Sequence, residues 1–170
     1  YICGIYIRHA ITKKKNINPE NIIMMGHSMG GALATNFASK HPNLKSLILI
    51  CPIYNLHNLG ERFLENPRLG AGIPKYVRKI TKWLKPLEWL NSLRFSTANK
   101  IGKVQASTYL LQSKNDSVTT IENARLLART ARNAGILKDF RVFPNGGHKV
   151  DKAKIEKISV ILDEIINKHV

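Results

Sequence analysis

The stretch NIIMMGHSMGGALATNF, residues 21–37, decides the fold. Its apolar beginning predicts a short buried strand, and the small residues at its end predict a helix. Between the two lies a Gly-x-Ser-x-Gly pattern formed by Gly26, Ser28 and Gly30. A serine at the sharp turn between a strand and a helix is held in a strained backbone conformation that exposes its hydroxyl. The stretch therefore predicts a nucleophile elbow.

The residues around this serine have expected roles of their own. Side chains at Gly26 and Gly30 would collide with the neighbouring strand or helix, so both positions are expected to require glycine. The backbone N–H of Met29 is expected to serve as an oxyanion-hole donor at the start of the helix. A strand over 22–25 and a helix over 30–40 supply the strand–turn–helix context without which the five-residue pattern is weak.

Strands and helices continue to alternate after the elbow. The run LKSLILICPI, residues 44–53, is continuously apolar, as is typical of a strand buried on both faces. Further strands are expected at 106–113 and 139–144, and helices at 120–135 and 151–170. The apolar residues expected on one side of the last helix are Ile155, Ile158, Ile161, Leu162 and Ile165. This alternation predicts an α/β fold with a parallel, doubly wound sheet.

The alternation is interrupted by residues 54–103, which are rich in proline and glycine. Within them, residues 74–85 have the apolar spacing of an amphipathic helix. We expect the two flanking segments, 1–53 and 104–170, to form one core and residues 54–103 to form a helical insertion. Residues 1–14 are expected to form a mostly apolar helix.

A serine becomes a nucleophile when a histidine accepts its proton and an acid orients that histidine. In a parallel sheet, the carboxyl ends of the strands meet at one edge, where functional residues collect. Asp116 follows the expected strand 106–113, and His148 follows the expected strand 139–144. The order Ser28, Asp116, His148 is the order that the elbow fold requires. We predict a triad of these three residues.

The remaining histidines and acids fit these roles less well. One histidine lies inside the elbow and the others have no suitable strand end nearby, so we interpret them as surface or core residues: His9, His27, His41, His57 and His169. Three further acids lie at the start of a strand or in the last helix: Asp139, Asp151 and Asp163. An ordinary turn aspartate and a loop histidine remain the alternatives for Asp116 and His148.

Composition limits the classes of function. The chain has 170 residues, of which 44% are hydrophobic and 22% charged, as in one globular domain. The net charge of +16 favours contact with anionic surfaces, but no recognition helix or aromatic ladder indicates specific nucleic-acid binding. The two cysteines, Cys3 and Cys51, lie in apolar surroundings and are expected to be buried and reduced, which favours a cytoplasmic setting.

Four segments of the chain resemble the α/β-hydrolase superfamily, and within it the monoacylglycerol lipase, lysophospholipase and carboxylesterase branch. They are MMGHSMGGALA (24–34), LILICPI (47–53), QSKNDSV (112–118) and FPNGGHKVD (143–151). The resemblance implies that Ser28 is the nucleophile, Asp116 the orienting acid and His148 the general base. It also implies that residues 54–103 form a cap over the substrate pocket.

The resemblance covers roughly the C-terminal two-thirds of that family's domain. Family members usually carry several strands before the elbow, one of them followed by a His-Gly loop with the second oxyanion donor. No such pattern precedes Ile22. We therefore expect an N-terminally truncated α/β-hydrolase fold, with the second donor outside the chain and the strand over 22–25 at an edge of the sheet.

The resemblance implies a serine hydrolase that cleaves carboxylic esters through an acyl-enzyme, without metal or cofactor. The expected substrate is a lipid ester of the monoacylglycerol or lysophospholipid type. An aminopeptidase-type hydrolase remains an alternative among enzymes. The other alternative is a non-catalytic remnant that docks on membranes, because residues 60–103 hold ten Lys/Arg, three Glu and the two tryptophans Trp83 and Trp89. In the simpler interpretation, the apolar stripe of these residues closes over the active site.

Overall fold

The computed structural model describes residues 18–56, 58–59 and 96–167. The helices expected over 1–14 and 74–85 lie outside the described residues. The same is true of six residues named above: Cys3, His9, His57, Trp83, Trp89 and His169.

The described residues form a four-stranded parallel sheet in the order β1-β2-β3-β4. The strands are β1 (Ile23–His27), β2 (Ser46–Ile50), β3 (Ser107–Ser113) and β4 (Leu137–Phe143). Each of them overlaps a strand expected from the sequence. Because all four strands are parallel, their carboxyl ends lie at one edge, just before the elbow, Asp116 and His148.

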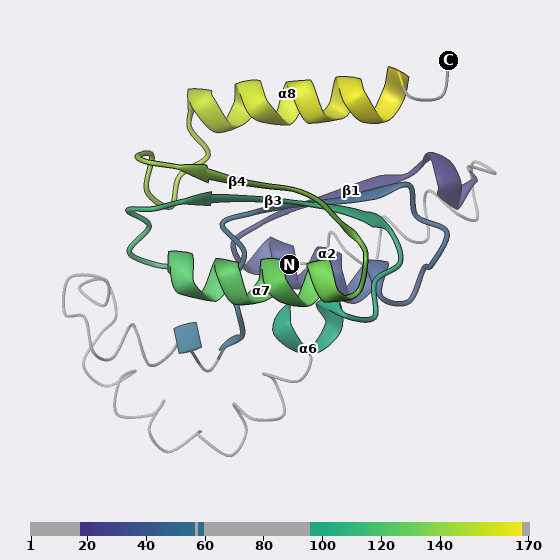
Figure 1. Cartoon of the computed structure of the whole chain (residues 1–170), viewed down its shortest axis with the longest axis horizontal. Helices are drawn as coiled ribbons and strands as arrows, with labels where there is room; N and C mark the ends of the chain where they lie inside the picture. The colour runs from purple at the N-terminus through teal and green to yellow at the C-terminus, as the bar shows by residue number, and fades with distance from the viewer. Residues whose placement is uncertain (1–17, 57, 60–95, 168–170) are drawn as a thin grey trace.

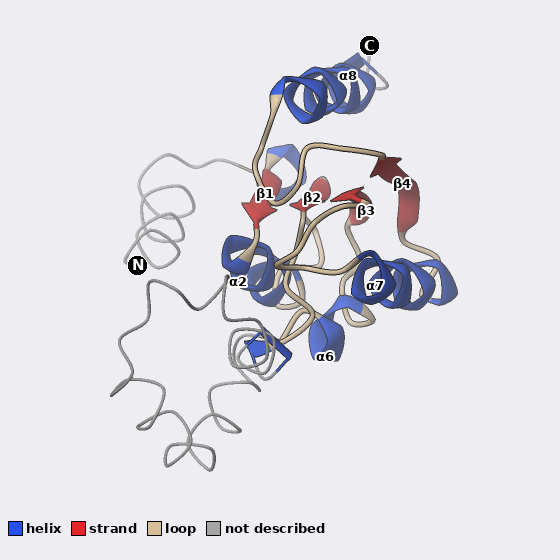
Figure 2. Ribbon diagram, turned by 90° about the vertical axis from the view of Figure 1, so that its left-hand side faces the viewer, coloured by secondary structure: helices blue, strands red, loops and turns tan. Residues whose placement is uncertain are grey.

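Helices cover both faces of the sheet, as the alternation predicted. The helices α2 (Met29–Ala38), α6 (Ala98–Ile101) and α7 (Ile121–Asn133) lie on one face, and α8 (Lys152–Asn167) lies on the other (Figures 1 and 2). A short 3-10 turn, η1 (Pro19–Asn21), precedes β1. The three layers confirm the doubly wound parallel architecture.

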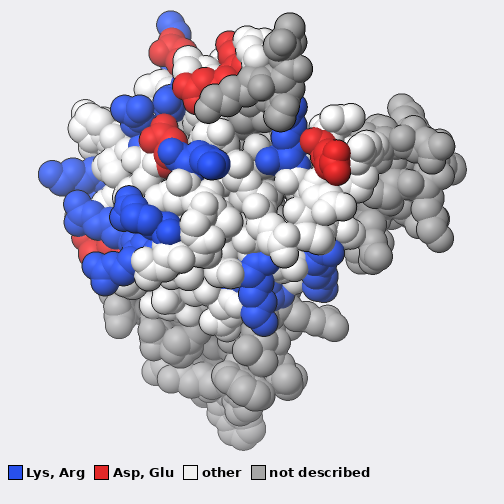
Figure 3. All heavy atoms as spheres, turned by 45° about the vertical axis from the view of Figure 1, so that its right-hand side comes forward, with Lys and Arg blue, Asp and Glu red and all other residues white. Residues whose placement is uncertain are grey.

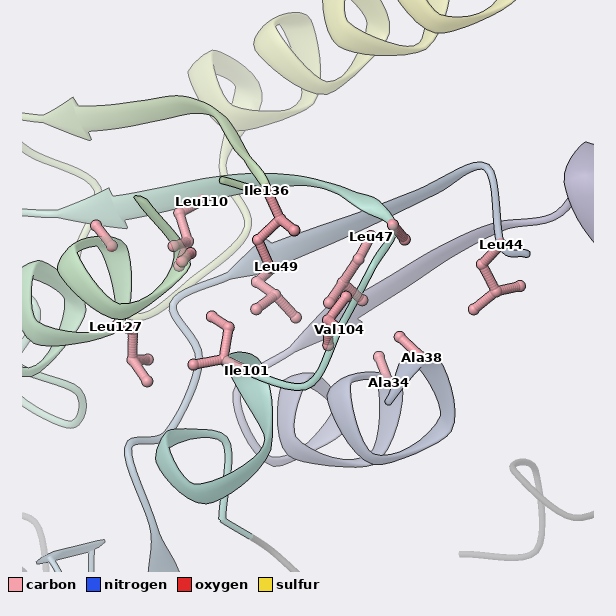
Figure 4. Packing of buried hydrophobic residues seen from close by; sticks show 13 residues of the cluster. Ala34, Ala38, Leu44, Leu47, Leu49, Ile101, Val104, Leu110, Leu127 and Ile136 are labelled. Atoms are coloured by element: carbon pink, nitrogen blue, oxygen red, sulfur yellow. The ribbon is translucent and has the colours of Figure 1, made fainter. Parts of the chain in front are cut away.

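The main core lies between the sheet and the helices α2, α6 and α7. All five residues of β2 are buried, which confirms that this strand is covered on both faces. Leu47 and Leu49 of β2 and Leu110 of β3 meet Leu127 of α7 in this core (Figure 4). Ile101 of α6 is fully buried in the same cluster, so the last residues of the expected insertion contribute to the core.

Among the described strands, β1 pairs with β2 alone and forms an edge of the sheet. Met25 in its middle is 52% exposed, although β1 is rich in apolar residues. An apolar edge strand is a surface on which a further strand can pair. The edge position expected for this strand is therefore confirmed.

The apolar side expected for α8 is partly wrong. Ile158 and Ile161 are buried against the sheet, but Ile155 is 53% exposed. The position one turn before Ile158 that faces the sheet is Lys154, whose side chain is fully buried. At about 100° per residue, positions 154, 158 and 161 lie on one line along a helix, and position 155 is turned away from it.

Candidate active site

The backbone at Ser28 has the strain expected of a nucleophile elbow. Its φ of 55° and ψ of −122° lie in a region that residues other than glycine rarely adopt. The N–H of Ser28 donates to the carbonyl of Ile50 at the end of β2, and its carbonyl accepts from the N–H of Gly31. These bonds hold the turn between β1 and α2, and Met29 follows as the first residue of α2.

The two glycines of the pattern differ in what surrounds them. A Cβ at Gly26 would lie 2.4 Å from the carbonyl oxygen of Gly30, so the expected collision is confirmed there. A Cβ at Gly30 would meet no described atom within 4 Å, so the collision expected at this position is wrong for the described part of the chain. The tight position on the helix is the next one, since a Cβ at Gly31 would lie 3.0 Å from the Cβ of Pro52.

The three residues predicted for the triad lie together at the carboxyl edge of the sheet. The Nε2 atom of His148 is 2.8 Å from the Oγ atom of Ser28, and its Nδ1 atom is 2.9 Å from the Oδ2 atom of Asp116. Ser28 follows β1, Asp116 follows β3 and His148 follows β4. Residues 120 positions apart in the chain are therefore in hydrogen-bond contact.

The carboxylate of Asp116 determines which ring nitrogen of a neutral His148 carries the proton. An ionised carboxylate can only accept, so Nδ1 of a neutral His148 must carry the proton and donate it to Asp116. The opposite nitrogen, Nε2, is then an acceptor for the hydroxyl of Ser28. This is the arrangement in which the imidazole can take a proton from the serine.

Asp116 is buried and yet held in its ionised form. Burial by itself raises the pKa of this carboxyl, but hydrogen bonds from His148 and from the backbone and hydroxyl of Thr119 outweigh burial, and the pKa lies well below its usual range. The backbone N–H groups of Val118 and Thr119 donate to Oδ1 at 2.8 and 2.9 Å, and the Thr119 hydroxyl donates to Oδ2 at 2.8 Å. The Nε2 amide of Gln112 donates to the same Oδ2 at 3.3 Å.

His27 is closer to the site than the sequence indicated. Its Nε2 lies 2.7 Å from the backbone carbonyl of His148, and the two rings are 4.9 Å apart. A carbonyl oxygen can only accept, so His27 donates this bond. His27 therefore contacts the loop that carries His148, a contact that the interpretation of this residue as a surface or core histidine did not include.

Cys51 stands beside the acid and the histidine. The Sγ of Cys51, a carboxylate oxygen of Asp116 and a ring nitrogen of His148 all lie within 4.8 Å of one another, which is close enough for a shared metal ion. Burial raises the pKa of the Cys51 thiol to about 12, although a backbone hydrogen bond from Ser113 acts against this rise. Metals bind the thiolate, and Asp116 and His148 already bond to each other. The donor set thus fits proton transfer better than metal binding.

Other candidate residues from the sequence have structural partners. The ring of His41 stacks on Phe37 at 4.1 Å. The carboxylate of Asp139 pairs with Lys157 at 3.3 Å, and Asp151 accepts from the N–H of Lys154 at the start of α8. These contacts agree with the interpretation of His41, Asp139 and Asp151 as structural residues. Cys51 is a buried free thiol, as predicted.

Sequence reasoning missed Thr119, which supports the acid from two atoms. A partial signal was present, because aspartate side chains in turns often accept from the backbone N–H two residues on, as Asp116 does from Val118. No sequence signal could have found Lys154, since a buried lysine is rare and follows only from the packing of α8.

Comparisons with known proteins agree with this fold. The chain is 22% identical to the monoacylglycerol lipases abhd6-B and abhd6-A of Xenopus laevis, over 98% of its own length and 61% of theirs. An esterase of Pyrococcus furiosus superposes with a TM-score of 0.68 at 15% identity, with 98% of this chain and 60% of the esterase covered. The acylaminoacyl peptidase of Pyrococcus horikoshii superposes with a TM-score of 0.66 at 17% identity, over 93% of this chain and 26% of the peptidase.

The chain thus spans about 60% of the length of the lipases and the esterase that it matches. The family model for the prolyl oligopeptidase family matches residues 5–164, which is nearly the whole chain. Together with the parallel sheet and its helices, this match bears out the α/β-hydrolase superfamily expected from the sequence. The chain belongs to the prolyl oligopeptidase family of α/β-hydrolases.

Proposed function

We propose that this chain carries the catalytic triad of a serine hydrolase that cleaves carboxylic esters. The observation that carries the proposal is the pair of hydrogen bonds that joins Ser28 to His148 and His148 to Asp116. The strained backbone at Ser28 adds to it, since strain of this kind collects at functional sites. Hydrolases of the esterase, lipase and peptidase types are the chain's relatives.

The proposed reaction proceeds in two halves. The Oγ of Ser28 attacks the ester carbonyl while its proton passes to Nε2 of His148, and Asp116 stabilises the imidazolium that forms. His148 then returns the proton to the leaving alcohol as the carbon–oxygen bond of the ester breaks. In the second half, water loses a proton to His148 and attacks the acyl carbon. The bond to Oγ of Ser28 then breaks, His148 returns the proton to that oxygen, and the acid leaves.

The backbone N–H of Met29 is the proposed oxyanion donor of this chain. Met29 follows Ser28 and begins α2, so its N–H belongs to the positive end of that helix. Preorganised donors of this kind stabilise the negative charge that develops on the carbonyl oxygen. Removing one such donor typically lowers kcat by about 10²–10³.

A lipid ester of the monoacylglycerol or lysophospholipid type is the proposed substrate. The curated relatives are named as monoacylglycerol lipases, and an esterase shares the fold. The proposed cap over residues 54–103 would bind the acyl chain. In its support, the N–H of Ala98 donates to the carbonyl of Tyr54 at 3.1 Å, so the chain leaves the core and returns to it at neighbouring points.

An amide substrate is the second candidate. The family model and the acylaminoacyl peptidase favour it, since both are named for peptidases. The two candidates differ in the bond that is cleaved. We expect hydrolysis of p-nitrophenyl acyl esters to be faster than hydrolysis of N-acylaminoacyl p-nitroanilides, and the reverse order would favour the peptidase.

Contact with an anionic membrane and a cytoplasmic location remain proposals. On the face of the molecule drawn in Figure 3, lysine and arginine side chains lie at several places, with fewer acids among them. In the described part of the chain, no helix is long and apolar enough to cross a bilayer. A non-catalytic docking module would bind anionic vesicles without reacting with an ester or a serine probe.

Labelling with a fluorophosphonate probe tests the proposal directly. We expect one adduct on the chain by intact mass, and no adduct on Ser28→Ala. Ser39→Ala is the matched control, because Ser39 is the residue that follows α2 and its hydroxyl donates to the carbonyl of Asn36. This control is expected to react like the parent. A folded chain without any adduct would contradict the proposed enzyme and favour the docking module.

A further inference from the structure

The loop between β4 and α8 that carries His148 is held by side chains from outside it. The exposed Asn115, beside the acid, accepts from the N–H of Gly147 at 2.9 Å. His27 donates to the carbonyl of His148 itself. The backbone of the loop is unusual, since Gly146 and Gly147 both have positive φ values, 105° and 55°. Such a turn is not locked by a regular backbone ladder and depends on these contacts.

The centre of these contacts is Lys154 of α8, whose side chain is fully buried. Its Nζ donates to the carbonyl of Lys149 at 2.6 Å and to the carbonyl of Gly147 at 3.3 Å. These two residues flank His148 on either side. One amino group therefore binds the carbonyl of the residue before the histidine and that of the residue after it.

The packing around this amino group leaves little freedom. A Cβ at Gly146 would lie 2.9 Å from Nζ of Lys154 and 2.0 Å from the carboxylate of Asp151. The Oδ2 atom of Asp151 lies 3.7 Å from Nζ of Lys154, and the side chain of Asp151 is 35% exposed. This carboxylate therefore balances the charge of the amino group from the solvent side. The ring of Phe143 is 5.9 Å from Nζ on the β4 side. A buried lysine costs stability unless its N–H donors have acceptors, and here carbonyls of the histidine loop are those acceptors.

We propose that Lys154 is a positioning residue for His148, which it holds by fixing the peptide carbonyls of Gly147 and Lys149. The role rests on the proposed function, in which His148 is the base that activates Ser28. Without the amino group, the carbonyls of Gly147 and Lys149 lose this shared donor and the loop relaxes. A shift of about 1 Å in a catalytic group can lower the rate by about 100-fold.

The test compares Lys154→Met with Lys157→Met in the full chain. Methionine keeps an unbranched apolar stem like that of lysine and removes the amino group with its donors. Lys157 is the matched control on the same helix, because its amino group pairs with Asp139 of β4 and not with the histidine loop. For Lys154→Met we expect kcat on a p-nitrophenyl ester to fall by about 10- to 100-fold with little change in KM. For Lys157→Met we expect a kcat within about twofold of the parent, because this lysine makes its ion pair with β4 and not with the histidine loop.

A second readout does not need activity. The Nδ1 proton of His148, bonded to Asp116, is expected as a far-downfield proton resonance in the parent and in Lys157→Met. It is expected to broaden or disappear in Lys154→Met. Because this signal is read without substrate, it tests Lys154 even in a chain that hydrolyses no ester. A folded Lys154→Met with the parent's resonance and kcat would overturn the proposal.

Two further variants separate positioning from simple loss of packing. Lys154→Arg keeps N–H donors and is expected to recover part of the kcat that Lys154→Met loses, whereas an equal loss in both would count against the donor role. Asn115→Ala removes the exposed anchor of the same loop and does not disturb a buried site. A folded Asn115→Ala with an unchanged resonance and kcat, next to a loss of both in Lys154→Met, would assign the positioning to Lys154 and not to Asn115, whereas equal losses in the two variants would count against a special role of Lys154.

Discussion

The substitution Gly26→Ala tests the packing of the elbow most sharply. The added Cβ would lie 2.4 Å from the carbonyl oxygen of Gly30 and 2.7 Å from the Cα of Gly31, both of them backbone atoms. Carbon and oxygen approach no closer than about 3.3 Å in ordinary contacts, so the strand and the first turn of α2 must separate by about 1 Å. Overpacking of this kind costs about 1–3 kcal/mol, and each kcal/mol lowers Tm by about 2–4 °C in a chain of this size.

The same displacement moves Ser28 relative to His148. A shift of about 1 Å is expected to slow fluorophosphonate labelling by about 100-fold. The matched control is Gly30→Ala, for which no described atom lies within 4 Å of the new Cβ. Because alanine is the better helix former, this control is expected to keep its Tm or gain up to about 1 kcal/mol in the free energy of unfolding.

Thermal unfolding followed by circular dichroism measures the stability of each variant, and intact mass against time measures labelling. A Gly26→Ala protein with the parent's Tm and labelling rate would refute the collision with α2. Equal losses in Gly26→Ala and Gly30→Ala would refute the distinction between the two glycines.

Two predictions concern the groups beside the nucleophile. The lowered pKa of Asp116 means that the unfolded chain binds this proton more readily, so the stabilisation is complete above the ordinary pKa of about 3.9 and declines as pH falls below it. Urea unfolding should therefore show a difference between the parent and Asp116→Asn that shrinks below about pH 4, and a difference that does not change with pH would refute this linkage. The raised pKa of Cys51, about 12 against 9.0 for a free thiol, lowers its thiolate fraction about 1000-fold, so iodoacetamide should modify it only in unfolded protein. Rapid modification of the native chain would contradict the burial of this thiol.

The sequence by itself determined the elements and the order of the site. The apolar run of β2 and the small residues of α2 follow from period and propensity, which are local properties of the chain. Asp116 and His148 were predicted because parallel strands bring their carboxyl ends to one edge, and any residue that follows such a strand is drawn there. The edge position of β1 was predicted through the resemblance and is confirmed among the described strands.

Only the tertiary structure decided which neighbours hold these residues in place. His27 and His148 are 121 positions apart, and their contact depends on the direction in which the elbow turns. The space beside Gly30 depends on how α2 leaves the sheet. Lys154 is buried because α8 turns that position, and not Ile155, towards the sheet. A pattern of apolar residues sets the period of a helix but leaves its rotation open by a fraction of a turn, and that fraction places a lysine beneath the histidine loop.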